Sequence, residues 1–299
     1  MKQIAESYEN KKVLVTGGAG FIGSHIVEEL IKNKAKVTIL DNFSSGSLNN
    51  LRNILPQINF IYGNICDPYT CLKAASKQEI VFHLAALASV QSSIKDPKTC
   101  YQTNTQGTKN MLEACIKNDI KAFVFSSSAA VYGTKEGDCN EKDKLDPLSP
   151  YAQSKVDGEE LCKQYGLEHN LNTACLRYFN VYGDRQDPKG EYSAVVAKFK
   201  HNLANNKPLA IYGDGKQTRD FIHISKIVQA NLKIALQENL KGEIFNIASG
   251  KSINLFELIE QLEKEMDTKK VDLLFQAARS GDVFTSKANC EKFKKLMLQ

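Results

Sequence analysis

The sequence predicts an α/β protein, in which a doubly wound parallel sheet of the Rossmann type stands beside a smaller domain that mixes helices and strands. Two observations predict the large sheet. Short apolar runs alternate with helical patterns through the first half of the chain, and a glycine-rich turn, TGGAGFIGSH, separates the first run from the first helix. The 299 residues, 42% of them hydrophobic and 24% charged, suffice for two unequal domains.

The strands predicted for the large sheet are short apolar runs. In chain order they occupy residues 11–17, 36–41, 58–64, 79–86, 121–133 and 172–183. The first helix, predicted at residues 21–33, places Ile22, Ile26 and Leu30 on one face. Because strands and helices alternate, the strands are predicted to run parallel, with a crossover after each one.

Helix and loop signals continue the pattern toward the middle of the chain. A long helix is predicted from Pro97 to Asn118, beginning after Asp96. Residues 133–150 are polar and rich in turn formers, so they are predicted to form a surface loop that leads into a helix at Tyr151.

The pattern becomes less regular in the last third of the chain. Residues 189–205 are predicted to be helical, residues 208–224 to form a hairpin, and residues 243–250 to form another strand. This change of pattern separates the larger domain from the smaller one.

The glycine-rich turn predicts a dinucleotide site at the start of the large sheet. Gly17, Gly20 and Gly23 are spaced G-x-x-G-x-x-G between the first strand and the first helix. Glycines there permit a tight turn and bring the backbone close to a pyrophosphate, which the helix N-terminus attracts. Asp41 ends the second strand, where its carboxylate can accept hydrogen bonds from ribose hydroxyls and would repel a ribose phosphate. The predicted cofactor is therefore NAD rather than NADP.

The predicted dinucleotide site also indicates how the chain divides into a nucleotide-binding domain and a substrate-binding domain. The larger, NAD-binding domain is predicted to comprise residues 1–180 and returning segments at about 219–248. The smaller domain is predicted to comprise residues 181–218 and 249–299.

A second motif predicts chemistry beside the cofactor. Tyr151 and Lys155, in the run SPYAQSK, are spaced Y-x-x-x-K and lie one helical turn apart on the same face. A phenol with a pKa of ~10 is a poor base at neutral pH, but a neighbouring ammonium favours the phenolate. Together with the glycine turn, the pair predicts an enzyme that deprotonates a hydroxyl beside a nicotinamide.

Composition argues against several other classes of protein. The net charge of +5 is spread along the chain without a basic block, which argues against a nucleic-acid surface. No segment approaches the length of a membrane-spanning helix, and the first residues lack the apolar run of a signal peptide. The eight cysteines contain no C-x-x-C pair. We therefore expect a cytoplasmic protein with reduced thiols, no metal, and no membrane or nucleic-acid partner.

The chain also resembles the extended short-chain dehydrogenase/reductase family, specifically its nucleotide-sugar 4-epimerases. The matching stretches occur in family order along nearly the whole chain: TGGAGFIGSH, LDNFSSG, VFHLAALASV, NTQGT, FSSSAAVYG, SPYAQSK, RYFNVYG, RDFIHI and ARSGDV. The resemblance implies an NAD-dependent enzyme that reversibly epimerises carbon 4 of a UDP-hexose.

The resemblance implies specific residues for the cofactor. Phe21 and Ile22 would lie at the pyrophosphate, and Asp41 and Asn42 at the adenosine ribose. Asn64 stands where the family usually has aspartate, so weaker adenine recognition is expected. The other residues implied for NAD are Gly17, Gly20, Gly23, Ser44, Ser45, Gly46, Ile65, Leu84, Ala85, Ala86, Asn104, Ser126, Tyr151, Lys155 and Tyr178.

The resemblance adds Ser128 to the catalytic residues Tyr151 and Lys155. The serine hydroxyl can donate and accept, so it can link the substrate hydroxyl to Tyr151. Dehydratases and decarboxylases of the family need an acid near this serine, whereas Ala129 and Ala130 follow it here. The implied reaction is therefore transient oxidation at carbon 4, in which Tyr151 takes the hydroxyl proton, hydride passes to NAD, and the 4-keto sugar rotates before reduction. Lys155 would hold the nicotinamide ribose.

The resemblance also implies that the enzyme holds its substrate by the nucleotide diphosphate. Arg219 and Arg279 match family arginines that clamp the diphosphate, a task suited to guanidinium groups. Asn180 matches a residue at the sugar-proximal phosphate. The other residues implied for the substrate are Ala88, Ser128, Tyr151, Ala194, Val195, Ala210, Tyr212, Asp282 and Ser286.

Sugar size is expected to depend on Ser286. In the family, the residue four past the aspartate of the G-D motif, here Asp282, flanks the 2-substituent of the sugar, and a small residue admits an N-acetyl group. Ser286 is small, so UDP-GlcNAc and UDP-GalNAc are expected substrates, with UDP-Glc and UDP-Gal also accepted. The alternative is that Phe284 fills the same space and restricts the enzyme to non-acetylated sugars.

Other interpretations remain open at this point. A UDP-hexuronic acid 4-epimerase would use the same Ser-Tyr-Lys residues, with an added cation near carbon 6 of the sugar. A non-catalytic NAD-binding regulator would not require them. The resemblance further implies a homodimer, built through helices near 99–118 and at Tyr151. The apolar residues there that permit a dimer, and that core packing explains equally well, are Met111, Leu112, Leu161 and Cys162.

Overall fold

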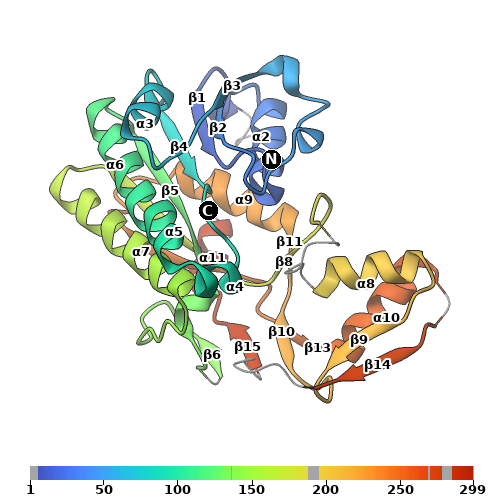
Figure 1. Ribbon diagram of the computed structural model, residues 1–299. Coiled ribbons are helices and arrows are strands. Elements are labelled where there is room, and N and C mark those ends of the chain that lie inside the picture. The colour runs from blue at the N-terminus through green and yellow to red at the C-terminus, as the bar shows by residue number, and fades with distance from the viewer. Residues whose placement is uncertain (1–5, 136, 188–194, 269, 278–284, 299) are drawn as a thin grey trace.

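The computed structural model of the chain describes residues 6–135, 137–187, 195–268, 270–277 and 285–298. Its central feature is a sheet of seven parallel strands in the order β12-β7-β5-β4-β1-β2-β3 (Figure 1). These strands are β1 (Lys12–Thr16), β2 (Lys36–Asp41), β3 (Ile58–Tyr62), β4 (Ile80–His83), β5 (Ala122–Ser128), β7 (Asn172–Tyr178) and β12 (Glu243–Ile247). The order reverses direction at β1, which confirms the predicted doubly wound parallel sheet.

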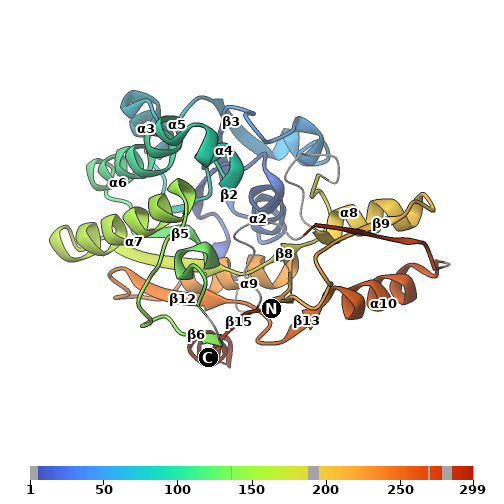
Figure 2. The same ribbon diagram turned by 60° about the horizontal axis from the view of Figure 1, so that its bottom comes forward.

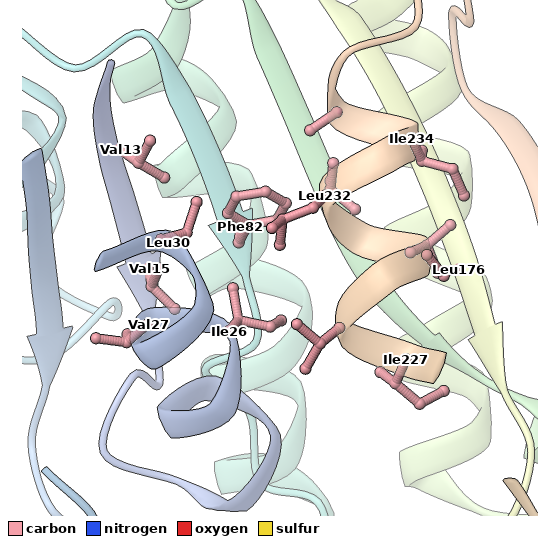
Figure 3. Packing of buried hydrophobic residues seen from close by; sticks show 14 of the residues in the cluster. Val13, Val15, Ile26, Val27, Leu30, Phe82, Leu176, Ile227, Leu232 and Ile234 are labelled. Carbon is pink, nitrogen blue, oxygen red and sulfur yellow. The ribbon is translucent and has the colours of Figure 1, made fainter. Parts of the chain in front are cut away.

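Helices cover both faces of this sheet. One face packs against α2 (Phe21–Lys32), α9 (Ile224–Ala235) and α11 (Glu291–Leu298), and the other against α3 (Pro68–Ala75), α6 (Gly107–Lys117) and α7 (Pro150–Glu168). Figure 3 shows the first layer, where strand residues such as Val13, Val15 and Phe82 meet Ile26 and Leu30 of α2. Because successive side chains of a strand point to opposite faces, Leu14 belongs to the second layer.

The helix predicted from Pro97 to Asn118 is present and contains an irregular segment. It consists of α5 (Pro97–Cys100), a π-helical segment η3 (Tyr101–Gln106) and α6, and it follows the short helix α4 (Val90–Lys95). Asp96 begins it by accepting a hydrogen bond from the Thr99 backbone N–H (3.0 Å). The π-helical segment carries the buried side chain of Asn104 toward the loop that follows β4.

A smaller lobe lies to the side of the large sheet (Figures 1 and 2). It contains α8 (Val195–Ala204), β9 (Leu209–Tyr212), α10 (Leu255–Met266) and β14 (Leu273–Gln276), which share a separate apolar core that includes Phe199, Leu209 and Leu258. A four-stranded sheet, in the order β13-β10-β15-β6, runs below the large sheet in Figure 1, from β6 beneath α7 to β13 beside this lobe. The remaining elements are β6 (Asp138–Cys139), β8 (Val181–Tyr182), β10 (Thr218–Asp220), β11 (Ile222–His223), β13 (Ser252–Asn254), β15 (Thr285–Ala288), η1 (Leu48–Asn50), η2 (Leu55–Gln57) and η4 (Ala129–Tyr132).

The hairpin predicted at residues 208–224 is wrong. β9 and β10 form in that segment, but they do not pair with each other. β9 pairs in parallel with β14, and β10 pairs with β13 and β15. Strand partners that lie far along the chain therefore prevail over the local turn signal at Gly213 and Gly215, both of which have positive φ.

The last described helix packs on the large sheet. Phe293 and Leu296 of α11 are buried in the same core as α2 and α9. The predicted boundary assigns residues 249–299 to the smaller domain, whereas α11 returns to the larger one. We therefore propose that the NAD-binding domain also includes residues 291–298.

Two further observations concern the surface. No helix of the described residues is long and apolar enough to cross a membrane. Met111, Leu112 and Cys162 are fully buried within the chain, and the partly buried Leu161 packs against their cluster. Packing inside the subunit therefore accounts for the apolar residues that permit a dimer in the sequence.

Candidate active site

A large cleft runs along the carboxyl ends of the parallel strands. Its volume is about 1150 Å³, and it reaches from the glycine turn after β1 to β10 and β15 beside the smaller lobe. Open α/β sheets bind ligands at this edge because the strand order reverses there and the crossover connections diverge. The cleft is large enough to hold a dinucleotide together with a second ligand.

The glycine turn forms one wall of the cleft with almost no space for side chains. Gly17 has a φ of +69°, and a Cβ atom there would lie 2.8 Å from the backbone nitrogen of Ala85. A Cβ atom on Gly23 would lie 2.2 Å from the carbonyl oxygen of Gly17. The N-terminus of α2 therefore opens onto the cleft beside bare backbone, a geometry that fits a pyrophosphate.

Asp41 lies where a ribose would follow this turn. The carboxylate is buried at the end of β2, where it accepts hydrogen bonds from the backbone N–H groups of Ala19 (2.9 Å) and Phe43 (2.8 Å). These bonds fix the carboxylate against the glycine turn, while Asp41 and Asn42 still line the cleft. The arrangement fits an adenosine ribose, whose hydroxyls can donate to a carboxylate.

Most of the residues predicted for NAD lie together on the cleft wall. They are Gly17, Gly20, Phe21, Ile22, Gly23, Asp41, Asn42, Ser44, Ser45, Asn64, Ile65, Leu84, Ala85, Ala86, Ser126, Tyr151, Lys155 and Tyr178. Asn64 accepts a hydrogen bond from the Cys66 backbone N–H (2.9 Å), so its amide oxygen is partly used within the loop.

Gly46 and Asn104 do not line the cleft. A Cβ atom on Gly46 would lie 2.9 Å from the Ala19 backbone, so this glycine packs behind the turn. The Asn104 side chain accepts from the Leu87 N–H (2.7 Å) and donates to the Leu87 carbonyl (3.1 Å) and to the Ser154 hydroxyl (2.9 Å). Asn104 therefore supports the loop after β4 from behind.

The three predicted catalytic residues meet on one side of the cleft. Ser128 ends β5, and Tyr151 and Lys155 occupy the first two turns of α7. Ser149 begins α7 by accepting a hydrogen bond from the Ala152 backbone N–H (3.1 Å), and Pro150 follows in the first helical position.

Lys155 is a buried cation beside the tyrosine. Its Nζ atom donates to the Ser126 carbonyl oxygen (2.7 Å) and lies 5.7 Å from the centroid of the Tyr151 ring. Burial lowers the pKa of Lys155 to about 8, because the ammonium loses water. The lysine therefore remains largely protonated at neutral pH and loses its charge more easily than an exposed lysine.

Tyr151 is held by a hydrogen bond with Ser128. Burial raises the pKa of Tyr151, and the hydrogen bond with Ser128 acts in the opposite direction. The phenol, the serine hydroxyl and the ammonium thus form a compact group, in which a proton at the phenol oxygen can be exchanged with a hydroxyl in the cleft.

His83 lies behind this group and was not among the predicted site residues. It is buried between hydroxyls, with Nδ1 2.8 Å from Thr16 Oγ1 and Nε2 3.1 Å from Thr108 Oγ1. Burial, followed by the charge of Lys155, lowers the pKa of His83 to about 3. His83 is therefore neutral and links the ends of β1 and β4 to α6.

The opposite end of the cleft is formed by the small four-stranded sheet. Arg219 on β10 and Ser286 on β15 are directly paired in the sheet register, and both line the cleft. Asn180 also lines it and donates to the Asp220 carbonyl oxygen (3.1 Å). The buried Asp220 carboxylate accepts from the backbone of Ser249 (2.8 Å) and Gly250 (3.0 Å), which fixes β10 against the end of β12.

The remaining residues predicted for the substrate divide into three groups. Ala88 lines the cleft. Val195, Ala210 and Tyr212 are not among its described lining residues and lie in the smaller lobe. Ala194, Arg279 and Asp282 lie outside the described residues.

Two further cations line the cleft, although the sequence did not single them out. Lys135 forms an ion pair with Asp143 (2.9 Å) in the loop after Ser128. Arg185 forms an ion pair with Glu28 of α2, and its Nη1 atom is buried without a hydrogen-bond partner in the described part of the chain. Such an unpaired donor in a cleft fits an anionic ligand. The position of Arg185, just after the NVYG motif, is the one sequence signal that could have indicated it.

Comparison with known proteins identifies relatives across the whole chain. Residues 13–248 match the family described as "NAD dependent epimerase/dehydratase family". A putative UDP-glucose 4-epimerase of Methanocaldococcus jannaschii is 41% identical over 287 residues, which cover 95% of this chain and 92% of the relative.

Solved structures show the same fold. A UDP-N-acetylglucosamine 4-epimerase from Methanobrevibacter ruminantium, in complex with UDP-N-acetylmuramic acid, superimposes with a TM-score of 0.91 at 38% identity, covering 97% of this chain and 93% of that one. A UDP-glucose 4-epimerase from Thermotoga maritima with UDP-glucose gives 0.88 at 36% identity, covering 95% and 91%. A UDP-glucose 4-epimerase from Thermus thermophilus in complex with NAD gives 0.85 at 32% identity, covering 96% and 92%.

Proposed function

The chain belongs to the NAD dependent epimerase/dehydratase family, and we propose that it interconverts UDP-sugars that differ at carbon 4, with UDP-GlcNAc and UDP-GalNAc among its substrates. The observation that carries this proposal is the meeting of Ser128, Tyr151 and Lys155 in one cleft with the glycine turn. The enzyme is NAD-dependent, and its relatives of similar length include UDP-sugar 4-epimerases.

The residues of the cleft support a proton exchange at the 4-hydroxyl. Tyr151 as phenolate accepts the hydroxyl proton, while the Ser128 hydroxyl bridges the two oxygens by hydrogen bonds. Lys155 favours the phenolate by its charge and is held in place by the Ser126 carbonyl. The chemistry that NAD supplies when bound is reversible hydride transfer at carbon 4. Tyr151 then returns the proton when the resulting 4-keto sugar has been reduced on its other face.

Ala129 and Ala130 argue for epimerisation over dehydration. Both residues line the cleft directly after Ser128, where a dehydratase needs an acid. The side chains of Ala129 and Ala130 carry no basic group, so neither can remove a proton from a carbon next to carbon 4. Rotation of the 4-keto sugar requires an anchor outside the sugar, and we propose that Arg219 supplies it at the diphosphate. Arg279 is proposed for the same role from its sequence alone.

Ser286 supports the acceptance of an N-acetyl group. Its small side chain lines the cleft, and its backbone carbonyl accepts a hydrogen bond from the Ser252 hydroxyl (2.9 Å), which fixes β15 at this end. Phe284, the residue that could fill the same space, lies outside the described residues. The assay that tests this proposal incubates the purified protein separately with UDP-GlcNAc and UDP-Glc, without added NAD, and resolves the products chromatographically. Conversion of UDP-Glc without conversion of UDP-GlcNAc would refute the acceptance of acetylated sugars.

Replacement of Ser286 by tyrosine is expected to narrow the sugar range. The bulkier ring would occupy the space of a 2-acetamido group, so kcat/KM for UDP-GlcNAc should fall by about 100-fold, a size that shape-based discrimination can reach. Turnover of UDP-Glc should persist, and Ser286→Ala should leave both activities close to those of the parent. An equal loss with both sugars would contradict this role.

A UDP-hexuronic acid is the second candidate substrate, because a cation lines the cleft near Ser128. Lys135 follows η4 in the loop beside the catalytic serine and could approach a carboxylate at carbon 6. Its ion pair with Asp143 already neutralises that charge, which favours an uncharged hexose. Adding UDP-glucuronic acid to the assay decides between them: conversion of this sugar in preference to UDP-GlcNAc would favour the second candidate.

We also propose a homodimer formed through the face that carries α4 and η3. Ile94 and Tyr101 are more than half exposed on these elements, although both side chains are large and apolar. Both α4 and η3 pack on α7, so a partner at this face would contact elements that support the helix carrying Tyr151. Light scattering after gel filtration should give twice the mass of one chain. The substitution Ile94→Asp should reduce the measured mass to that of a single chain. A parent protein that elutes as a monomer would contradict the proposal.

A further inference from the structure

A buried ion pair lies directly behind the catalytic residues. Glu159 is on α7, one helical turn beyond Lys155, and Arg177 is on β7. The two side chains are only 3% and 1% exposed. The guanidinium binds the carboxylate through two hydrogen bonds, from Nε to Oε1 (2.8 Å) and from Nη2 to Oε2 (2.7 Å). We call these two residues the Glu159–Arg177 pair.

The carboxylate of the pair holds the catalytic strand. Ser127 donates its hydroxyl to Glu159 Oε1 (2.5 Å), and it stands between Ser126, whose carbonyl accepts from Lys155, and Ser128. Two successive turns of α7 are therefore hydrogen-bonded to consecutive residues of β5. These two contacts hold β5 directly before Ser128, whose hydroxyl accepts a hydrogen bond from the Ala130 backbone N–H (3.2 Å).

The guanidinium of the pair holds the loop that follows the strand. Arg177 Nη1 donates to the Tyr132 hydroxyl (2.8 Å) and to the Glu141 carbonyl oxygen (3.2 Å). The Tyr132 hydroxyl in turn donates to Asn246 Oδ1 on β12 (2.7 Å). Tyr132 and residues of the loop after it line the cleft beyond Ser128, so Arg177 of β7 connects this part of the cleft wall, through Tyr132, to β12 as well.

We propose that the Glu159–Arg177 pair positions Ser128 and the following loop for the carbon 4 reaction. We also propose that the negative charge of Glu159, one helical turn beyond Lys155, stabilises the protonated form of that lysine. This inference rests on the proposed function. Stability alone does not call for the pair, because apolar residues of similar volume replace a buried ion pair without loss in many proteins. Its contacts are directed instead at the two sides of the catalytic serine.

The electrostatic part of the inference follows from the groups that face Lys155. They are Cys100 of α5, His83 of β4, and Tyr151, Glu159 and Cys162 of α7. Burial raises the pKa of the Cys100 thiol and lowers that of His83, whereas the Glu159 carboxylate is ion-paired with Arg177 and brings a negative charge one helical turn from Lys155. The anion raises the pKa of Lys155 and opposes the larger effect of burial. Arg177, on β7 beyond Glu159, carries the balancing positive charge.

Kinetic comparison of a single and a double variant separates positioning from stability. In Glu159→Gln, which keeps the shape of the side chain, kcat should fall by about 100-fold, the loss that a displaced catalytic group can cause. KM should change less than kcat, because Glu159 bonds Ser127 and Arg177 rather than Arg219, the residue proposed to hold the diphosphate. The double variant Glu159→Leu with Arg177→Met leaves no unpaired charge at this buried position. Its thermal stability should therefore be close to that of the parent protein, while kcat should stay low. A double variant with the parent kcat would refute the positioning role.

An exposed ion pair provides the matched control. Lys200 and Glu265 form a contact of 2.8 Å in the smaller lobe, with side chains that are 35% and 58% exposed. Glu265→Gln should leave kcat and thermal stability unchanged, since exposed pairs contribute little.

Competitive acetylation tests the electrostatic role without any substrate. The pH dependence of Lys155 labelling by acetic anhydride, followed by peptide mass spectrometry, should show a midpoint near the pKa of about 8 in the parent. Loss of the carboxylate disfavours the ammonium, so the midpoint should move to lower pH in Glu159→Gln. An unchanged midpoint would refute this role. A parent protein that converts no UDP-sugar would refute the proposed function instead, and the labelling result would still decide the inference.

Discussion

Replacement of Tyr151 by phenylalanine is expected to lower epimerisation by about 10²–10⁴-fold, the contribution typical of a positioned acid or base. The change removes only the phenol oxygen, which is hydrogen-bonded with Ser128 in the cleft. The substrate hydroxyl would then have no group to receive its proton. Turnover measured with each UDP-sugar, together with the NAD released on denaturation, checks the result. NAD content should match that of the parent, because the glycine turn and Asp41 are unchanged.

A surface tyrosine provides the control for this substitution. Tyr69 is 74% exposed on α3, so Tyr69→Phe should leave turnover and NAD content unchanged. Turnover that survives Tyr151→Phe would overturn the proposed mechanism, and loss of bound NAD would assign Tyr151 to cofactor binding instead.

Replacement of Gly23 by alanine is expected to remove NAD binding and to lower the free energy of unfolding by about 1–3 kcal/mol, the usual cost of overpacking. In an exposed helix, alanine would be the more favourable residue. Here its Cβ atom would lie 2.2 Å from the Gly17 carbonyl oxygen and 2.9 Å from the Gly18 Cα atom. Both are backbone atoms, so no side chain can move aside, and the turn itself must shift. Denaturant unfolding and NAD content measure the two effects.

The matched control is a glycine with open space around it. A Cβ atom on Gly137 would meet no atom of the described chain within 4 Å, so Gly137→Ala reports only the cost of its positive φ. NAD should remain bound in that variant. An NAD content in Gly23→Ala equal to that of the parent would show that the turn tolerates displacement.

The large sheet could be predicted because its signals are local. The inner strands of a parallel sheet are buried on both faces, as β1, β2 and β4 are here, so they appear in the sequence as short apolar runs. The run at residues 36–41 ends in Asp41, and the structure has β2 at Lys36–Asp41. The hairpin prediction for residues 208–224 failed because the strands in this segment pair with strands that are distant in the sequence. β10 pairs with Ser252–Asn254 and Thr285–Ala288, and no local pattern predicts which distant strands will meet.

The candidate site likewise contains residues that the sequence could indicate and residues whose role only the structure reveals. Residues in direct contact with a cofactor or a reacting atom carry motifs, because the chemistry limits both their type and their spacing. Arg177 is the first residue of the RYFNVYG stretch, but its local sequence does not indicate its partner, because Glu159 lies 18 residues earlier on a helix and Arg177 lies on a strand. Asn104 was predicted to stand beside the cofactor, whereas its amide holds the Leu87 backbone from behind. Spacing alone does not distinguish a residue on the wall of a cleft from one that supports the wall.

The sequence by itself determined the parallel sheet, the glycine turn, the acidic end of β2, and the Ser128, Tyr151 and Lys155 group, because each depends on residues close together in the chain or on a chemistry with few solutions. Only the tertiary structure decided which distant segments complete the site. It brought Arg219 and Ser286 into register, returned α11 to the large sheet, and placed a buried ion pair behind Ser127 and Ser128. These arrangements depend on packing and on buried charge, which act between residues that are remote in sequence and adjacent in space.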